Sequence, residues 1–441
     1  MLPDDVLLEI FAFYVEKGNF CLIDYSIDGW HTLVHVCRTW IILVFGSPRR
    51  LNLRLRFGTA TRPVRAQRTL DIWPPLPIVL CQVDHQSWGT RWDIDTIIEA
   101  LEHNDRVCEI ELWDLSSSQF KPILAAMQEP FPALTNLRLH SPGSPTAEVI
   151  PNSFLGGSAP SLRGLTLREI AFPGLRILLS SATHLVQLDL WRIPHSGYMS
   201  PEAMVTCLST LTRVETLRFE FLSRGSRRPH PLTRSALPAL THFRFKGFSE
   251  YLEDFVARID TPMLHDLEVT FFRQPIFDTP NLPQFISRTQ SLKAHDAAGV
   301  VVSDSGVWLV PEGPYASVGL DVPYNQSGWP STFAQICRSS LPHTFLSLLQ
   351  NLYLRDGQLP WEDELENIPQ ENPQWLELLH PFTAVKSLYL EEEIAPLIAP
   401  TLQGLVGERV VEILPELQGL FFDEVNLAGS VQEAISQFVA A

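Results

Sequence analysis

The stretch that decides the fold is Leu185-Val186-Gln187-Leu188-Asp189-Leu190, which has apolar residues at its first, fourth and sixth positions. The fourth and sixth positions are two residues apart, so in an extended strand both side chains point to the same side. One short strand cannot form a core by itself. Because the chain repeats this pattern many times, it predicts a sheet built from stacked units.

Copies of the pattern run through most of the 441 residues. The clear copies are Val107/Ile110/Leu112, Leu134/Leu137/Leu139, Leu162/Leu165/Leu167, Leu185/Leu188/Leu190, Val214/Leu217/Phe219, Leu240/Phe243/Phe245, Leu264/Leu267/Val269, Leu349/Leu352/Leu354, Val385/Leu388/Leu390 and Leu417/Leu420/Phe422. Weaker copies are Leu76/Val79/Cys81 and Tyr315/Val318/Leu320. In the widest gap, between Leu264 and Tyr315, we expect a degenerate unit near Leu292 and a long loop around Ala297–Gly313.

The segments between the expected strands have apolar residues three or four apart, which is typical of helices. Ile94, Ile97 and Leu101 form one such set. Ser200-Pro201-Glu202 is a favourable start for another helix, with an N-cap serine and a proline in the first turn. The arrangement resembles the leucine-rich repeat family over roughly residues 70–425. The resemblance implies a solenoid with parallel strands on its concave face and helices outside.

The first 45 residues lack the repeat and predict helices. The first helix begins at Pro3, and its apolar residues are Val6, Leu7, Leu8, Ile10, Phe11, Phe13, Tyr14 and Val15. A surface helix normally carries one apolar stripe, so this helix must bury a second face. A second helix is expected over about Trp30–Phe45, ended by Gly46 and Pro48. The pair is too small to bury this surface alone, which implies a partner.

These helices contain a motif that resembles an F-box. Such a motif begins with Leu-Pro, continues with an Ile-Phe pair and closes with Val-Cys-Arg-x-Trp. This chain has Leu2-Pro3, Ile10-Phe11 and Val36-Cys37-Arg38-Thr39-Trp40. The resemblance implies binding to a Skp-type adaptor, which tethers the protein to a cullin-based ubiquitin ligase. The implied adaptor contacts are Leu2, Pro3, Val6, Leu7, Ile10, Phe11, Val36, Cys37 and Trp40. The alternative is that some of them only form the small helical core.

The segment after the helices predicts a cap for the solenoid. Residues 51–57 alternate strictly between apolar and polar, which indicates a strand with one buried face, and a proline-rich run follows at 73–77. We therefore predict an α/β fold in three parts. The parts are an F-box-like helical domain over 1–48, a cap strand and linker over 49–75, and a leucine-rich-repeat solenoid over 76–441 with an irregular insertion near 292–330.

Three aromatic residues follow repeat strands by one or two positions: Trp113, Trp191 and Phe221. Aromatic side chains are frequent anchors in protein interfaces, so these three are candidates for binding a target protein. The alternative is that they pack between neighbouring strands. Glu391-Glu392-Glu393 and the seven arginines of 49–68 predict solvated surfaces, with docking of basic and acidic partners, respectively, as the alternatives.

The composition excludes several classes of protein. With 45% hydrophobic residues the chain is not mostly disordered. The net charge is −17, and residues 351–441 hold sixteen acidic and three basic residues, which repels phosphate backbones and predicts no nucleic-acid binding. No apolar run approaches the ~20 residues of a membrane span, and no secretory signal is evident. The six scattered cysteines fit a reducing compartment, so we expect a cytoplasmic and/or nuclear protein.

No phosphate-binding loop, hydrolase elbow or zinc-protease motif is present, so we predict no catalytic residue, metal or cofactor. The favoured hypothesis is a non-catalytic substrate receptor of a ubiquitin ligase. It would bind the Skp-type adaptor through the helices and an unidentified target protein through the solenoid. The first alternative is a protein-interaction scaffold whose F-box-like segment only caps the solenoid. The second is an enzyme with a site in Ala297–Trp329, where Asp304, Asp321 and Tyr324 are polar candidates.

Overall fold

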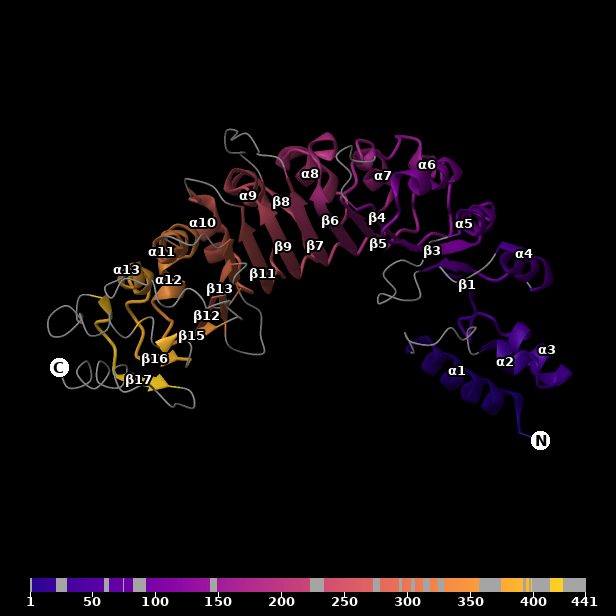
Figure 1. Cartoon of the computed structure of the whole chain (residues 1–441), viewed down its shortest axis with the longest axis horizontal. Helices are drawn as coiled ribbons and strands as arrows, with labels where there is room; N and C mark the ends of the chain where they lie inside the picture. Colours follow the sequence, from indigo (N-terminus) through magenta and orange to yellow (C-terminus); the bar gives the residue numbers. More distant parts are fainter. Residues whose placement is uncertain are drawn as a thin grey trace. The chain divides into compact units, whose positions relative to one another are not determined.

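Each copy of the apolar pattern forms a β-strand in the computed structural model of the chain (Figure 1). The structure describes residues 2–20, 30–58, 63–73, 75–81, 93–142, 149–222, 234–272, 278–292, 296–302, 306–311, 318–323, 329–356, 374–391, 394–395, 398 and 413–422. It divides into two compact units, Met1–Tyr198 and Met199–Ala441, and each is described by itself.

The first unit begins with helices and continues with parallel strands that alternate with helical segments. Its helices are α1 (Asp4–Phe20), α2 (Trp30–Val34), α3 (Arg38–Gly46), α4 (Pro63–Ile72), α5 (Ile94–Leu101), α6 (Ser117–Ala126) and α7 (Leu175–Ser181), with short 3-10 turns at Phe154–Gly157 and His195–Gly197. Its strands are β1 (Leu55–Phe57), β2 (Ile78–Leu80), β3 (Val107–Leu112), β4 (Asn136–His140), β5 (Gly164–Arg168) and β6 (Gln187–Ile193). The strands pair in chain order.

The strand pairing brings equivalent leucines of successive repeats side by side. Leu137 pairs with Leu165, which pairs with Leu188. All three side chains are fully buried. Burial of a leucine side chain contributes about 1.5–3 kcal/mol, so a slip of one residue, which turns every leucine outward, is strongly disfavoured. The prediction of stacked strand–helix units with one parallel strand in each is therefore confirmed in this unit.

The helices between strands begin at polar caps that the sequence supplies. The Asp93 side chain accepts hydrogen bonds from the backbone N–H groups of Asp95 (3.1 Å) and Thr96 (3.4 Å) at the start of α5. In the second unit, the Ser200 hydroxyl accepts one from Ala203 (3.3 Å), directly before a helix that begins at Pro201. These contacts satisfy N–H groups that have no partner within the helix. The predicted start at Ser200 is confirmed.

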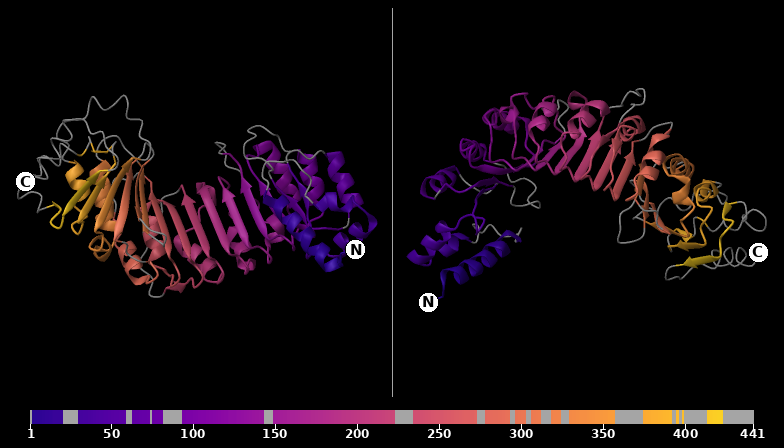
Figure 2. Two further views of the ribbon diagram at one scale, coloured as in Figure 1. Left: turned by 90° about the horizontal axis from the view of Figure 1, so that it is seen from below. Right: turned by 180° about the vertical axis from the view of Figure 1, so that it is seen from behind.

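The second unit repeats this plan with one departure. Its helices are α8 (Pro201–Leu208), α9 (Ser249–Val256), α10 (Asn281–Arg288), α11 (Trp329–Ser340), α12 (His343–Leu346) and α13 (Gln374–Leu379). Its main strands are β7 (Thr216–Phe221), β9 (His242–Gly247), β11 (Asp266–Phe271), β12 (Ala297–Val302), β13 (Gly306–Pro311), β14 (Val318–Pro323), β15 (Asn351–Asp356), β16 (Ser387–Leu390) and β17 (Gly419–Phe422), and β8 (Ser235–Ala236) pairs with β10 (Ile259–Asp260). Figure 2 shows the strands of the unit side by side, with helices along one face.

The departure lies in the predicted irregular insertion. Strand β14 is parallel to β11, β13 is antiparallel to both β14 and β12, and β12 is parallel to β15. The expected long loop around Ala297–Gly313 is therefore wrong, because the β-branched run Val300–Val302 and the facing Val307 and Leu309 form a buried hairpin. The weak copy at Val318 and Leu320 is a true repeat strand, β14.

The N-terminal region also differs from prediction in three places. The second predicted helix is two helices, α2 and α3, because Cys37 adopts an extended backbone and breaks the run. The cap strand covers only Leu55–Phe57, because Asn52 has a positive φ of 48° and the chain turns there. Leu51 and Leu53 are nevertheless buried, as the alternation predicted. Helix α4 was not predicted at all.

A buried carboxylate ties two helices of the second unit together. Glu253 on α9 is 4% exposed and accepts hydrogen bonds from the backbone N–H groups of Asn281 (2.7 Å) and Leu282 (2.9 Å) at the start of α10. Burial raises the pKa of Glu253 from 4.5 to about 7, and the two backbone hydrogen bonds offset this only in part. The carboxyl group is thus more easily protonated in the folded unit than in the unfolded chain.

This shift predicts that the unit loses stability as the pH rises. The contribution of Glu253 is fully present below pH 4.5 and is lost as the pH rises through about 7, on the order of 3 kcal/mol in total. Glu253→Gln removes the titration, so we expect wild type to become less stable relative to this variant between pH 5 and pH 8. Urea unfolding at both pH values measures the difference. The exposed Glu377→Gln is the control, and a constant difference between wild type and Glu253→Gln would contradict the assignment.

Candidate functional site: the outer face of the N-terminal helices

Helix α1 begins where the sequence predicts. The Pro3 carbonyl accepts hydrogen bonds from the N–H groups of Val6 and Leu7, both at 3.1 Å. Asp4 and Asp5 lie in the first turn, where carboxylates interact favourably with the positive end of the helix dipole. The helix therefore presents the apolar residues that follow at fixed angular positions.

One side of α1 packs against α2 and α3. Leu8 and Phe11 are buried, and the Phe11 ring lies 4.6 Å from the Trp40 ring, centroid to centroid. Leu33 and Val44 contribute to the same buried side. Phe11 and Trp40 were both predicted as adaptor contacts. Phe11 is fully buried in the helical core, and Trp40 is half-buried, so the structure places both in the alternative role, the small helical core.

The other side of α1 is apolar and exposed. Val6 and Ile10 are four residues apart on α1 and are 42% and 49% exposed, and Leu2, just before the helix, is 53% exposed. Phe13 continues the row one turn later and is 60% exposed. Tyr14 is 46% exposed and lies at the edge of the row, where its hydroxyl accepts a hydrogen bond from the Thr32 hydroxyl of α2 at 3.2 Å. Residues with this spacing share one helix face. The helix thus has two apolar faces, one inside the bundle and one outside.

The α2–α3 corner adds further exposed apolar groups. Val36, in the turn, is 59% exposed, and Ile41 and Ile42 on α3 are 38% and 70% exposed. Pro3 and Cys37 are also exposed, while Leu7 is half-buried. Of the sixteen exposed large hydrophobic residues in the described part of the chain, eight lie between Leu2 and Ile42. We call Leu2, Val6, Ile10, Phe13, Tyr14, Val36, Ile41 and Ile42 the outer face.

Four outer-face residues were not predicted as binding residues: Phe13, Tyr14, Ile41 and Ile42. The sequence spacing could have identified Phe13 and Tyr14, because they follow Ile10 by three and four positions on a predicted helix. No such spacing pointed to Ile41 and Ile42, whose exposure depends on the break between α2 and α3.

Contacts to the start of the sheet hold the helices in place. Arg50 pairs with Asp5 (3.1 Å) and Glu9 (2.6 Å) of α1. Hydrogen bonds from Glu9 and Asp5 raise the pKa of the Arg50 guanidinium. Trp30 is 1% exposed, and its indole N–H donates to the Arg54 carbonyl at 3.1 Å, immediately before β1. The Trp30 ring also lies 5.3 Å from the Trp73 ring at the end of α4.

The three aromatic residues predicted to bind a target differ in their exposure to solvent. Trp113 and Trp191 are half-exposed, and they flank the ends of β4 and β5 without meeting. The Trp113 indole N–H donates to Glu111 (2.9 Å), and its ring lies 5.6 Å from the His140 ring. Phe221 is 2% exposed and lies 5.0 Å from the Tyr251 ring of α9. Phe221 therefore packs in the core, which is the alternative that the sequence left open.

Charged groups lie between the two tryptophans. His140 Nδ1 is 2.9 Å from an Asp114 carboxylate oxygen, and Arg192 pairs with Glu169 at 2.7 Å. Burial lowers the pKa of His140, with a further lowering from Arg168. Asp114, Glu169 and Arg192 all have positive φ. Asp114 and Glu169 lie just past the ends of β3 and β5, and Arg192 lies near the end of β6. The acidic and basic side chains near these strand ends therefore pair with one another. Because both signs of charge are present, they do not indicate a particular class of ligand.

Of the three polar candidates for the enzyme alternative, the structure describes only Asp321. Asp321 on β14 accepts a hydrogen bond from the Thr270 hydroxyl at 3.1 Å, and burial raises its pKa. Asp304 and Tyr324 lie outside the described residues. Among the described residues, no group of three or more His, Cys, Asp or Glu side chains is placed to hold a metal ion. The described helices include none that is long and apolar enough to cross a membrane.

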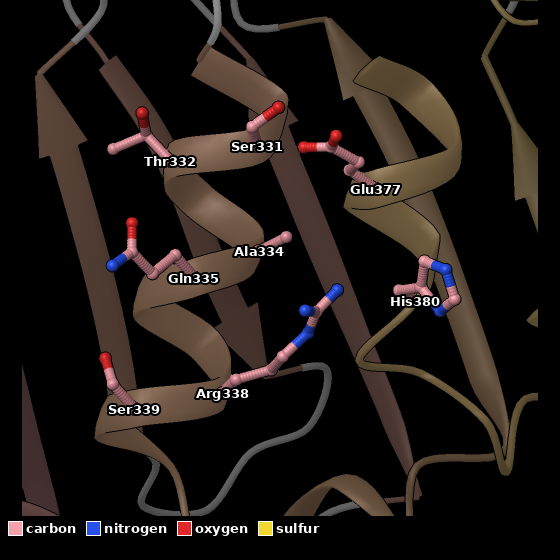
Figure 3. Close-up of a pocket in the computed structure, with 8 residues that line it drawn as sticks. All are labelled: Ser331, Thr332, Ala334, Gln335, Arg338, Ser339, Glu377 and His380. Atoms are coloured by element: carbon pink, nitrogen blue, oxygen red, sulfur yellow. The ribbon is translucent and has the colours of Figure 1, made fainter. Parts of the chain in front are cut away.

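A polar groove runs between α11 and α13 of the second unit (Figure 3). Its lining residues are Ser331, Thr332, Ala334, Gln335, Arg338, Ser339, Glu377 and His380. Arg338, Glu377 and His380 are all exposed to solvent, and their charges are of both signs. Salt in the solvent screens exposed charges such as these, so the groove does not indicate a specific ligand.

Comparison with known proteins adds little. No family model matches the chain, and no curated protein matches it. One solved structure that matches is the leucine-rich repeat-containing protein LegL7 from Legionella pneumophila, with 12% sequence identity and a TM-score of 0.30, over 88% of this chain and 98% of that chain. A TM-score this low carries no argument. The class of protein is therefore defined by the structure itself: stacked strand–helix repeats preceded by helices with an exposed apolar face.

The two faces of α1 predict opposite mutational effects. Phe11→Ala leaves a cavity beside Trp40 and should destabilise the helices by about 3–5 kcal/mol. Ile10→Ala, one position earlier, removes an exposed group and should change stability by no more than about 0.5 kcal/mol. Limited proteolysis of the N-terminal segment and thermal unfolding measure both. Equal effects of the two substitutions would contradict the assignment of inner and outer faces.

Proposed function

We propose that the protein is a substrate receptor of a cullin-based ubiquitin ligase and that its outer face docks a Skp-type adaptor. The observation that carries the proposal is the concentration of exposed apolar residues on α1 and the α2–α3 corner. Exposed apolar side chains concentrated in one short segment are typical of a protein interface. The resemblance of the segment to an F-box names the kind of partner.

Exposure favours some of the implied residues over others for the proposed contact. Of the nine residues that the F-box resemblance implies, Leu2, Pro3, Val6, Ile10, Val36 and Cys37 are exposed and Leu7 is half-buried. Phe11 and Trp40 act as positioning residues instead, because their contact fixes α1 against α3. Phe13, Tyr14, Ile41 and Ile42 join the proposed contact set through their exposure.

In this proposal the protein performs no chemistry. The adaptor and cullin place it near a charged ubiquitin carrier, in the cytoplasm or nucleus, and the repeat sheet holds a target protein. Holding both together raises the effective concentration of target lysines at the carrier. The sheet suits this task, because the positions between the buried leucines of each strand are free to vary without loss of the core.

A second candidate is an interaction scaffold in which the helices only cap the sheet. The packing of Trp30 against Phe45 and Trp73, and its hydrogen bond to the Arg54 carbonyl, favour a capping role. A capped repeat end is needed for solubility in any solenoid. Capping explains the inner face of the helices, but it leaves the outer face without a role.

The test is adaptor binding by the purified full chain. Val6→Asp with Ile10→Asp places two charges in the centre of the outer face, and we expect at least a hundredfold loss of affinity for a Skp-type adaptor. Single alanine substitutions at either position should each cost about 2 kcal/mol or more, if they lie at the centre of the interface. Isothermal titration calorimetry measures both.

The matched control is Ile177→Asp on α7, a 54% exposed isoleucine far along the sheet. It should bind the adaptor as wild type does. Failure of the folded wild-type chain to bind any Skp-type adaptor would overturn the receptor proposal and favour the scaffold.

A further inference from the structure

Three aromatic side chains form a stacked row across the last described strands of the second unit. Tyr353 on β15 pairs in register with Tyr389 on β16, which pairs with Phe421 on β17. The ring centroids are 4.3 Å and 4.7 Å apart, and the ring planes differ by only 12° and 16°. We call these three residues the aromatic ladder. No single repeat contains it, because it arises from the parallel register.

The ladder lies on the face of the sheet opposite the core. Leu352, Leu354, Leu388 and Leu390 alternate with it along β15 and β16 and are buried. Successive side chains of a strand point to opposite faces, so the tyrosines point away from that core. The described helices α11 and α13 lie along the core face of these strands (Figure 1). Tyr353 and Tyr389 are half-exposed, and Phe421 is 45% exposed.

One end of the ladder already holds a guanidinium group. The Arg355 guanidinium carbon lies 5.0 Å from the centre of the Tyr353 ring, within the range of a cation–π contact. Phe421 forms the other end. A Cβ placed on Gly419 would lie 2.7 Å from Phe421 Cε2, so the ring rests over the bare backbone of Gly419. The absence of a side chain there leaves the stack undisturbed.

An acidic residue lies on the same face of the sheet as the ladder. Glu391 follows Tyr389 by two positions and so shares its face, and its N–H donates to the Leu354 carbonyl at 3.1 Å, which continues the strand pairing. Arginine combines a positive charge with a planar group that stacks on aromatic rings.

We propose that the aromatic ladder docks an arginine-bearing segment of a protein partner. A partner arginine stacks on the Phe421 end as Arg355 does on the Tyr353 end, and Glu391 supplies charge complementarity. The partner is the ligase target only if the proposed function holds, but the docking surface does not depend on adaptor binding.

The experiment measures the affinity of the full chain for three labelled peptides of equal length, with repeats of Arg-Gly-Ser, Lys-Gly-Ser and Glu-Gly-Ser. Fluorescence anisotropy should show tightest binding for the arginine peptide, weaker binding for lysine and none for glutamate. Phe421→Leu and Tyr389→Leu keep an apolar side chain but remove the ring, and each should weaken arginine-peptide binding at least fivefold. Glu391→Gln should weaken it as well, and high salt should weaken it in wild type.

Matched controls separate the ladder from general effects of charge and folding. Phe272→Leu removes a ring of the separate Phe248–Phe272 pair, and Glu377→Gln removes an exposed acid on α13. Both should bind as wild type does, and thermal unfolding verifies that all variants fold. Wild type that does not bind the arginine peptide, or that binds lysine or glutamate peptides equally well, overturns the proposal. So does unchanged binding in the ladder variants. Adaptor affinity measured on the same proteins tests the proposed function independently.

Discussion

Lateral pairing of the repeat strands is the constraint on which the rest of the structure depends. A strand–helix unit of 23–36 residues cannot bury its own apolar face and becomes stable only against its neighbours. Parallel pairing aligns Leu165 with Leu188, and equivalent residues in the second unit, into continuous apolar rows. The same register aligns the intervening positions on the opposite face. The parallel register therefore produces both the buried core and the rows of side chains on the opposite face. The aromatic ladder is one such row.

The N-terminal helices solve a different physical problem. They are too short to bury all of their apolar side chains, so α1 uses Phe11 to hold α3 and leaves Ile10 and Val6 in water. Exposed apolar surface is unfavourable unless a partner covers it. Trp30 and Arg50 fix the helices to the start of the sheet, so these contacts hold the outer-face residues in place before a partner binds. This pre-organisation reduces the entropy that binding must overcome.

The sequence predicted the structure well where the outcome depends on a local pattern of residue types. The period of the leucines predicted the strand at each copy of the pattern, including the weak copy at Val318, but it did not predict β12. Ser200-Pro201 predicted a helix start. The sequence was less informative where the outcome depends on distant pairing. The hairpin of β12 and β13, which places β14 beside β11, needs contacts across many residues. Phe11 and Ile10 are adjacent apolar residues of one motif, and only the position of α3 decides which is buried. The ladder likewise required the register of three strands.

Hydrogen exchange of the full chain, with and without a saturating Skp-type adaptor, tests the central claim most directly. Backbone amides gain protection where a partner covers or rigidifies them. The account predicts new protection in α1 and the α2–α3 corner, around Val6, Ile10 and Val36, and no change in β15–β17. No change in the helices, or protection only in the sheet, would contradict the assignment of the outer face as the docking surface.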